Sequence, residues 1–389
     1  MAIPLIYNLR SVMQRPASTA NTAIGIGFVV AILIGAFALA SGFQAALVGT
    51  GSPNNVMVLR TGADSEISSG VSRDAANIIR ALPDVAVDPQ GRPLVSAETV
   101  VLISRPRIGQ TGESNVTVRG VDPGGFPLRS QVDIVEGRMF APGSDEVIAG
   151  QRIGRRFTGC KVGDVLRFGQ RDFKVVGHFT AKGSAFESEI WGDATVLGPA
   201  LGRGTTAQSV TFTMRDASRF PAIKKQLETD PRLGVQVKTE REWYDEQSRV
   251  FATVIRVGGI FITLIMAVGA IFGAMNTMYA AVGARTREIA TLMVLGFSRV
   301  SVMTSFILES VILALIGGVL GCLLAIPING ITTSTTNWSS FSEVAFAFRV
   351  TPLGIVLGLV FAAAMGIVGG FFPALRAARQ PLAATLRGE

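Results

Sequence analysis

The side chains that could serve catalysis are few and lie far apart in the sequence. The chain has one histidine, His178, and two cysteines, Cys160 and Cys322. His178 lies in a strand-like run with no acid or thiol close to it in sequence, so a hydrogen-bonded structural histidine is the favoured interpretation. No histidine, cysteine and carboxylate set has metal-ligand spacing. We therefore expect no catalytic residue and no metal site in this chain.

The sequence also lacks the glycine-rich loop that binds nucleotide phosphates. Lys161 lies between Gly159 and Gly163, but the spacing and the hydroxyl residue of a phosphate loop are missing there. We expect this chain to need no cofactor of its own. Any work that requires energy would then depend on a partner.

Two polar side chains, Glu309 and Asn276, lie within long apolar runs. Glu309 follows Arg299 by ten residues, which places it about 15 Å into the bilayer at 1.5 Å per residue, and Asn276 has a similar depth. We predict a hydrogen bond from Glu309 to Asn276 or Thr277. Such an acid can belong to a proton or substrate relay, or it can join two helices. The second role is favoured, because no second titratable group lies across the expected spans.

The whole chain is apolar, and its charges are placed unevenly. Its 389 residues are 48% hydrophobic with a mean hydropathy of +0.43, which favours a membrane protein. The net charge is +8. The arginines that flank apolar runs are Arg10, Arg15, Arg285, Arg287, Arg299, Arg376, Arg379 and Arg387. This is the positive-inside pattern of membrane proteins, so the basic charge indicates topology and not nucleic-acid binding.

Four apolar runs are each long enough to cross a bilayer, which takes about 20 helical residues. We expect a polytopic α-helical membrane protein with four transmembrane helices. Along the chain, the expected segments are a cytoplasmic amphipathic helix at 1–21, the first span at 22–43, an extracytoplasmic domain at 44–250, the second span with its stalk at 251–283, a short cytoplasmic helix at 284–298, the third span at 299–328, a short outer loop at 329–350, the fourth span at 351–373 and a cytoplasmic tail at 374–389. The first run is longer than a signal-peptide core, so a retained span is favoured over a cleaved one.

The segment 44–250 reads as a folded α+β domain, because charges of both signs alternate along it. Strand-like runs occur at 56–60, 94–103, 115–121, 165–168, 173–179, 209–214 and 235–238, and helical patterns occur at 72–82 and 217–229. We expect two lobes, one from about 44–125 plus 205–239 and one from 126–204. The segment 239–281 has no helix breaker and predicts one long helix from this domain into the second span.

The second and third spans form a hairpin with a charged tip. Thr286 can cap a short helix there, and Ile289, Leu292 and Met293 form its apolar stripe. Gly296 is placed to end this helix, and Ser298 can cap the next one. Because a continuous helix transmits displacement, we predict that this tip is a lever moved by a cytoplasmic partner.

Small residues recur four positions apart in the apolar runs, a spacing that lets helix backbones approach closely. The pairs are Gly269 with Gly273, Gly317 with Gly321, Gly354 with Gly358, and Gly366 with Gly370. Since four helices alone make a thin bundle, we expect a dimer.

Several of these segments follow a known pattern. They are 276–278, 285–289, 295–296, 309–310 and 317–321, together with the opening 7–10 and the closing 373–381. Together they resemble the FtsX-like permease domain of MacB-type ABC transporters. The segment 189–191 resembles part of the external core domain of that family. The resemblance covers nearly the whole chain and is strongest over 252–382.

The resemblance implies a permease that is a homodimer or half of a heterodimer in the bacterial cytoplasmic (inner) membrane. A separate cytoplasmic ABC ATPase subunit would carry ATP and Mg²⁺, and a periplasmic adaptor protein could bind the external domain. The residues implied in coupling to the ATPase are Arg285, Arg287, Glu288, Ile289, Leu292, Met293, Leu295 and Gly296.

Three functions remain open from the sequence. The first is ATP-driven export or extraction of a hydrophobic or amphipathic substrate at the outer face. The second is an FtsX-like mechanical lever that activates an extracytoplasmic partner, although the external domain expected here is larger than is usual for such members. The third is a membrane anchor or receptor without an ATPase.

Overall fold

The computed structural model describes residues 16–204 and 206–380. The chain divides into two compact units. The helical unit contains the described residues of 1–42, 253–331 and 348–389, and the α/β unit is Phe43–Ala252 with Thr332–Ala347. Most of the predicted amphipathic start and the end of the predicted tail lie outside the described residues.

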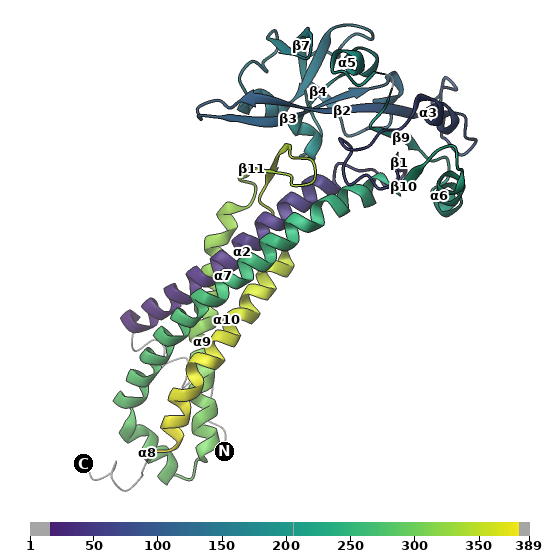
Figure 1. Cartoon of the computed structure of the whole chain (residues 1–389). Coiled ribbons are helices and arrows are strands. Elements are labelled where there is room, and N and C mark those ends of the chain that lie inside the picture. Colours follow the sequence, from purple (N-terminus) through teal and green to yellow (C-terminus); the bar gives the residue numbers. More distant parts are fainter. Residues whose placement is uncertain (1–15, 205, 381–389) are drawn as a thin grey trace. The chain divides into compact units, whose positions relative to one another are not determined.

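Long apolar helices make up the helical unit (Figure 1). They are α2 (Pro16–Val48), α7 (Glu240–Ala284), α9 (Arg299–Ala325) and α10 (Pro352–Ala378), and the short α8 (Thr286–Val294) connects α7 to α9. In the described part of the chain, four helices have the length and composition needed to cross a membrane, which agrees with the four predicted spans. The long helix predicted over 239–281 is confirmed as α7.

Close backbone contacts join α9 to its neighbours. A Cβ atom at Gly366 of α10 would lie 2.7 Å from the Cβ of Ala314 and 2.9 Å from the carbonyl oxygen of Ser310. A Cβ atom at Gly321 would lie 2.5 Å from the carbonyl oxygen of Gly27 on α2. Two of the predicted glycine pairs, those on α9 and at the end of α10, therefore pack helices within one chain. By contrast, a Cβ atom at Gly269 or Gly273 of α7 would meet no other described atom within 4 Å.

One mixed sheet forms the frame of the α/β unit. Its strand order is β10-β1-β9-β2-β3-β8-β5-β7-β4, with β6 paired to β7. The β3–β8 and β5–β7 pairs are parallel and the others are antiparallel. The strands are β1 (Asn55–Arg60), β2 (Val95–Pro106), β3 (Glu113–Val121), β4 (Asp133–Gly137), β5 (Glu146–Gly150), β6 (Val165–Phe168), β7 (Arg171–Thr180), β8 (Glu189–Asp193), β9 (Ser209–Thr213) and β10 (Val235–Thr239).

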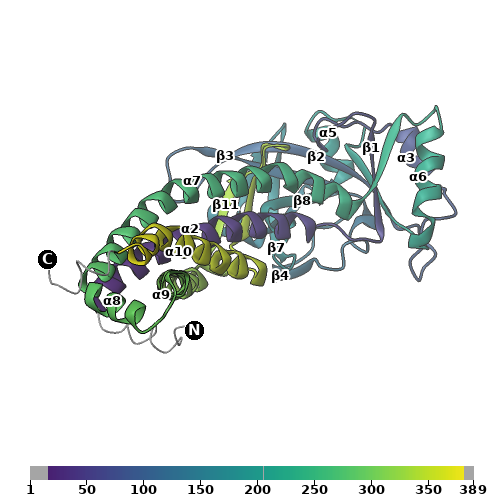
Figure 2. The same cartoon turned by 90° about the horizontal axis from the view of Figure 1, so that it is seen from below.

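Two hydrophobic clusters cover this sheet. The helices of the unit are α3 (Arg73–Arg80), α4 (Gln151–Arg156), α5 (Ala194–Ala200) and α6 (Phe220–Thr229). Ile79 of α3 and Ile223 of α6 pack with Phe212 in the first cluster, and Ile153 of α4 and Leu197 of α5 pack in the second. In Figures 1 and 2, α3 and α6 lie together beside β1, away from β4 and β7. The lobe boundaries given above stay a prediction.

The sequence patterns missed several short elements. All seven predicted strands and both predicted helices are present, whereas β4, β5, β8, α4 and α5 were not predicted. The predicted outer loop is wrong in one respect: it folds as a hairpin of β11 (Thr332–Thr336) and β12 (Glu343–Ala347) that belongs to the α/β unit. Threonine-rich β11 suits a strand, because β-branched residues favour extended backbone.

The contact at Gly366 predicts a specific loss of stability. We expect Gly366→Leu to destabilise the chain by about 1–3 kcal/mol, because the added atoms would push against backbone atoms of α9. The measurement is the thermal unfolding temperature of the detergent-solubilised chain. Gly25→Leu is the control, since a Cβ atom there meets no described atom within 4 Å. Equal losses for the two variants would contradict the assigned packing.

Candidate functional site

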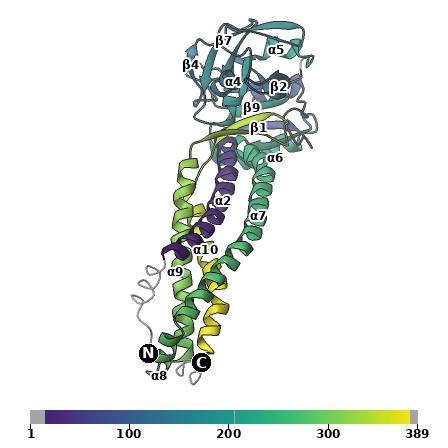
Figure 3. The same ribbon diagram turned by 90° about the vertical axis from the view of Figure 1, so that its left-hand side faces the viewer.

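The turn between α7 and α9 contains the residues predicted to couple the chain to a partner. Figures 1 and 3 show α8 at one end of the helical unit, where α7 ends and α9 begins. The Ser298 hydroxyl accepts a hydrogen bond from the Ser301 N–H at 3.2 Å, so the predicted cap of α9 is confirmed. Gly296 has a φ of 96°, a conformation that favours glycine after a helix. The predicted Thr286 cap is wrong, because its hydroxyl donates to the Gly283 carbonyl of α7 at 2.8 Å.

Burial divides the predicted coupling residues into an inner and an outer group. Ile289 is buried, and Leu292 and Met293 are half-buried. Ile289 packs with residues of α7, α9 and α10 in one hydrophobic cluster. Among the predicted coupling residues, Arg287, Glu288, Leu295 and Gly296 are exposed, and so are Thr291 and Val294 beside them. This outer group carries two opposite charges and several apolar side chains, and it is accessible to another protein.

Arg285 belongs to the inner group, and it pairs with the acid of the third span. Its Nη1 atom lies 3.2 Å from Glu309 Oε2, and both side chains are 8% exposed. Arg285 also lies 3.6 Å from Glu288. A buried carboxylate gains more from a charged partner than from an amide. The ion pair ties the start of α8 to α9.

The predicted hydrogen bond from Glu309 to Asn276 or Thr277 is wrong. Asn276 is exposed, and the Thr277 hydroxyl lies 2.7 Å from that of Thr22 on α2. The long Arg285 side chain reaches Glu309 from the turn, which an estimate of equal depth along two helices did not take into account.

Both ring nitrogens of the lone histidine have a hydrogen-bond partner. His178 Nδ1 lies 2.8 Å from Glu136 Oε2, and Nε2 lies 2.8 Å from the carbonyl oxygen of Cys160. Both partners accept hydrogen bonds, so the ring makes both bonds when both nitrogens carry a proton. Burial raises the pKa of Cys160 to about 11, which keeps this thiol protonated at neutral pH. Among the described residues, no cluster of three or more His, Cys, Asp and Glu side chains could hold a metal ion.

The start of α7 is bonded into the α/β unit by a residue that the sequence did not single out. Glu240, the first residue of α7, is 1% exposed. Its Oε1 accepts a hydrogen bond from Arg129 at 2.7 Å. Its Oε2 accepts from the Ser52 N–H at 3.0 Å and from the Asn55 amide at 2.9 Å. Both oxygens of Glu240 are thus occupied, and α7 begins at a fixed point.

A chain of buried ion pairs continues from Glu240 across the sheet. Arg129 and Arg119 each lie 2.7 Å from Glu98. Arg119 also lies 2.8 Å from Glu66 and 2.8 Å from Glu189. Burial alone would raise the pKa of Glu98, but the two arginines outweigh it and lower that pKa below its ordinary value. We name these six residues, the four glutamates and the two arginines, the buried ion network.

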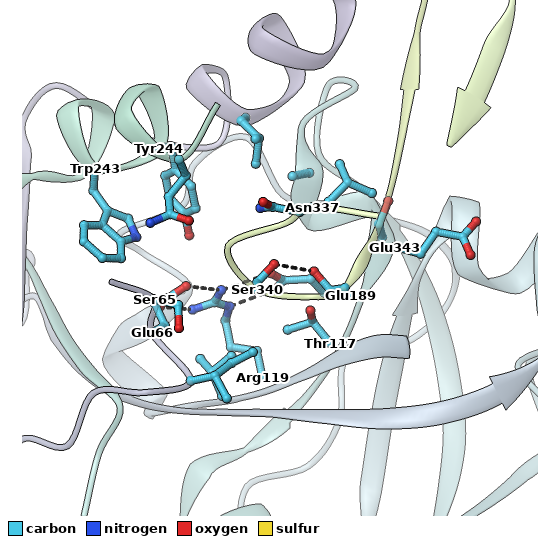
Figure 4. A pocket seen from close by; sticks show the side chains of 18 residues that line it. Ser65, Glu66, Thr117, Arg119, Glu189, Trp243, Tyr244, Asn337, Ser340 and Glu343 are labelled. Carbon is cyan, nitrogen blue, oxygen red and sulfur yellow. Dashed lines mark hydrogen bonds and ion pairs between the residues drawn. The ribbon is translucent and has the colours of Figure 1, made fainter. Parts of the chain in front are cut away.

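A cavity of about 50 Å³ lies beside the buried ion network (Figure 4). Arg119, Glu66, Glu189 and Tyr244 line it together with residues of the β11–β12 hairpin. The Tyr244 hydroxyl is buried without a hydrogen-bond partner among the described residues. Burial raises the pKa of Tyr244 well above its ordinary value, so the hydroxyl remains a donor. The cavity has room for a few water molecules but not for an organic substrate.

The bonds of Glu240 predict that its charge stabilises the α/β unit. We expect Glu240→Gln to destabilise the chain by about 3 kcal/mol, because it leaves Arg129 short of one negative partner in a buried place. Thermal unfolding of the solubilised chain measures this. Glu242→Gln, on the exposed side of the same helical turn, is the control and should change stability by less than about 0.5 kcal/mol. Comparable effects of both variants would refute the special role of Glu240.

If the Arg285–Glu309 pair holds α8, breaking the pair should make α8 more mobile. In Glu309→Gln, the backbone amides of α8 should exchange hydrogen at least about tenfold faster, because Arg285 loses its buried negative partner. Exchange measured by mass spectrometry on the chain in lipid nanodiscs tests this. Glu288→Gln removes only the exposed partner of Arg285 and should leave exchange in α8 within about twofold. An unaltered rate in Glu309→Gln would show that the pair does not hold α8.

Comparison with known proteins identifies both parts of the chain. Residues 19–230 match the family model of the MacB-like periplasmic core domain. Residues 260–382 match that of the FtsX-like permease C-terminal region.

Similar proteins of known name include exporters that are longer than this chain. The "Macrolide export ATP-binding/permease protein MacB" of Bdellovibrio bacteriovorus is 25% identical over 94% of this chain and 58% of its own length. The protein of the same name from Bordetella avium is 25% identical over 86% of this chain and 55% of its own length. The "Pyoverdine export ATP-binding/permease protein PvdT" of Pseudomonas entomophila is 28% identical over 65% of this chain and 40% of its own length. The chain spans about half the length of the curated relatives it matches.

Solved structures with some similarity cover only part of the chain. The periplasmic region of MacB from Actinobacillus actinomycetemcomitans is 13% identical, with a TM-score of 0.37 over 49% of this chain and 91% of its own. The extracellular domain of the transporter YknZ from Gram-positive bacteria is 16% identical, with a TM-score of 0.36 over 48% of this chain and all of its own. Since the first family model alone matches more than half of the residues, the chain belongs to the family of ABC transporter permeases that join a MacB-like periplasmic core domain to an FtsX-like permease C-terminal region.

Proposed function

We propose that this chain is the membrane subunit of an ATP-driven ABC transporter and passes the motion of an ATPase to its α/β unit. The observation that carries the proposal is the continuity of α7. This helix has 45 residues, or about 68 Å at 1.5 Å per residue. It ends next to α8 at one end and begins at the buried Glu240 at the other. A rod fixed at its far end transmits displacement along its axis.

We assign ATP and Mg²⁺ to a separate nucleotide-binding subunit that docks on the exposed group of α8 and its following turn. The relatives' names combine ATP-binding and permease functions, which supports an ATPase as the partner. Arg287 and Glu288 offer opposite charges to such a partner, and Leu295 offers an apolar contact. Arg285 and Ile289 act from inside, because they hold α8 on the helical unit.

The arginines that flank the spans favour a cytoplasmic α8 and an extracytoplasmic α/β unit. We also propose that the chain lies in the bacterial inner membrane. The open surroundings of Gly269 and Gly273 on α7 support a homodimer or a heterodimer with a related permease.

The relatives' names refer to macrolide and pyoverdine export, and we propose export or extraction of an amphipathic substrate, with a periplasmic adaptor as a further partner.

A second candidate function is mechanical activation of an extracytoplasmic partner by the same lever. The small size of the cavity beside the start of α7 favours it, because that cavity has no room for an organic substrate. Substrate-stimulated ATP hydrolysis by the reconstituted complex separates the two candidates. Only the exporter should show it.

Copurification and a charge reversal test the lever. The wild-type chain should copurify with an ABC ATPase subunit, and failure to do so would favour a membrane anchor or receptor.

In nanodiscs, we expect the double variant Arg287→Glu/Glu288→Arg to reduce the ATP-dependent signal of a probe on the α/β unit by at least about twofold, because it inverts the docking charges. The matched control is Asp230→Arg/Arg232→Asp, which reverses an ion pair within the α/β unit. A full probe signal in the α8 variant would contradict the docking assignment.

A further inference from the structure

The β11–β12 hairpin is the only part of the described chain between α9 and α10 that belongs to the α/β unit. Its strands pair antiparallel from Thr332 with Ala347 to Thr336 with Glu343. The second strand is deeply buried, since Glu343 is 3% exposed and Phe346 is fully buried. Burial of a glutamate is costly unless its charge is paired, so a loop that only connects two spans would leave it exposed.

Two arginines from distant parts of the α/β unit hold this glutamate. Glu343 Oε2 accepts hydrogen bonds from Arg107 Nε at 2.8 Å and Nη2 at 2.5 Å. Arg156, the last residue of α4, lies 3.2 Å from Glu343 Oε1 and also donates to Ser334 of β11 at 2.5 Å. Burial would raise the pKa of Glu343, but the hydrogen bonds it accepts outweigh burial and lower that pKa. Glu343 is therefore charged at neutral pH. We name Glu343, Arg107 and Arg156 the hairpin latch.

Backbone and ring contacts reinforce the latch. The Ala345 N–H donates to the Ser188 hydroxyl at 2.9 Å, and the Arg152 guanidinium donates to the Ala345 carbonyl. The Phe346 ring lies 5.5 Å from the ring of Phe43, in the last part of α2. Trp338, in the segment between β11 and β12, lies 5.6 Å from Phe251 of α7, and Phe43 and Phe251 lie 4.3 Å apart. The hairpin thus contacts the ends of both helices that enter the α/β unit.

We propose that the hairpin latch is a further mechanical attachment, through which α9 and α10 hold the α/β unit in addition to α2 and α7. This inference rests on the proposed lever function and assigns Glu343, Arg107 and Arg156 as positioning residues for it. The reason is geometric. The ends of α2 and α7 enter the unit side by side, with the rings of Phe43 and Phe251 4.3 Å apart, and a body held at one place can still rotate about it. An attachment from the hairpin removes that freedom. Since α8 lies between α7 and α9 in the chain, a displacement of the turn acts on both α7 and the latch.

The attachment itself is tested on the chain alone, in lipid nanodiscs and without any partner. In Glu343→Gln, amide hydrogen exchange over 343–347 should become at least about tenfold faster, because a buried ion pair has lost one charge. Arg107→Gln removes the same pair from the side of the sheet and should give the same result. Asp145→Asn, which breaks the exposed pair with Arg171, is the control and should leave this segment unchanged. Unaltered exchange in both latch variants would overturn the attachment.

The transmission role is tested in the complex with the ATPase subunit. Glu343→Gln should still copurify with the ATPase and retain basal hydrolysis within about twofold, whereas the ATP-dependent probe signal on the α/β unit should fall at least about twofold. Faster exchange over 343–347 together with a full probe signal would overturn the transmission role. If the wild-type complex gives no ATP-dependent signal, the proposed function and this role both fail. The exchange experiment still decides the attachment, because it needs no ATPase.

Discussion

The α/β unit depends on the compensation of buried charge. Arg129 is fully buried, and burial alone would lower its pKa, but Glu98 and Glu240 raise it instead. A guanidinium in such a place is tolerated only while its carboxylate partners stay in contact, because an uncompensated buried charge is far more costly than the pair is favourable. One of those partners is the first residue of α7. The start of the long helix is therefore held by the electrostatics of the sheet beside it.

The other end of α7 lies next to a turn in which some residues are buried and others are exposed. There the ion pair between Arg285 and Glu309 and the packing of Ile289 hold α8 on the helical unit, while Arg287 and Leu295 remain exposed. The turn combines an anchored inner side with an accessible outer side. A partner that pushes on the outer side would move helices and not a loose loop, because the inner side has little freedom of its own.

Sequence patterns predicted the elements that are determined by residues close together in the sequence. Membrane thickness sets span length, so the apolar runs identified α2, α7, α9 and α10 without knowledge of their packing. The predicted strands were found because they carry β-branched and apolar runs, whereas β4, β5 and β8 each begin with an acidic residue and contain a glycine, residue types that are depleted in strands. The partner of Glu309 and the buried ion network were missed for a different reason. Glu66, Glu189 and Glu240 meet only in the folded sheet, and no spacing in the sequence brings them together.

The β11–β12 hairpin lies far from the rest of the α/β unit in the sequence, and this affects how the unit can be isolated. A fragment cut at 44–250, the boundaries that the sequence suggests, would omit Thr332–Ala347 although these residues belong to the same compact unit. It would leave the cations of Arg107 and Arg156 without Glu343 and the Ser188 hydroxyl without the Ala345 N–H. Such a fragment would expose a surface that Thr332–Ala347 covers in the whole chain. Any self-association or ligand binding measured on that fragment would need to be repeated with the missing strands restored through a peptide linker.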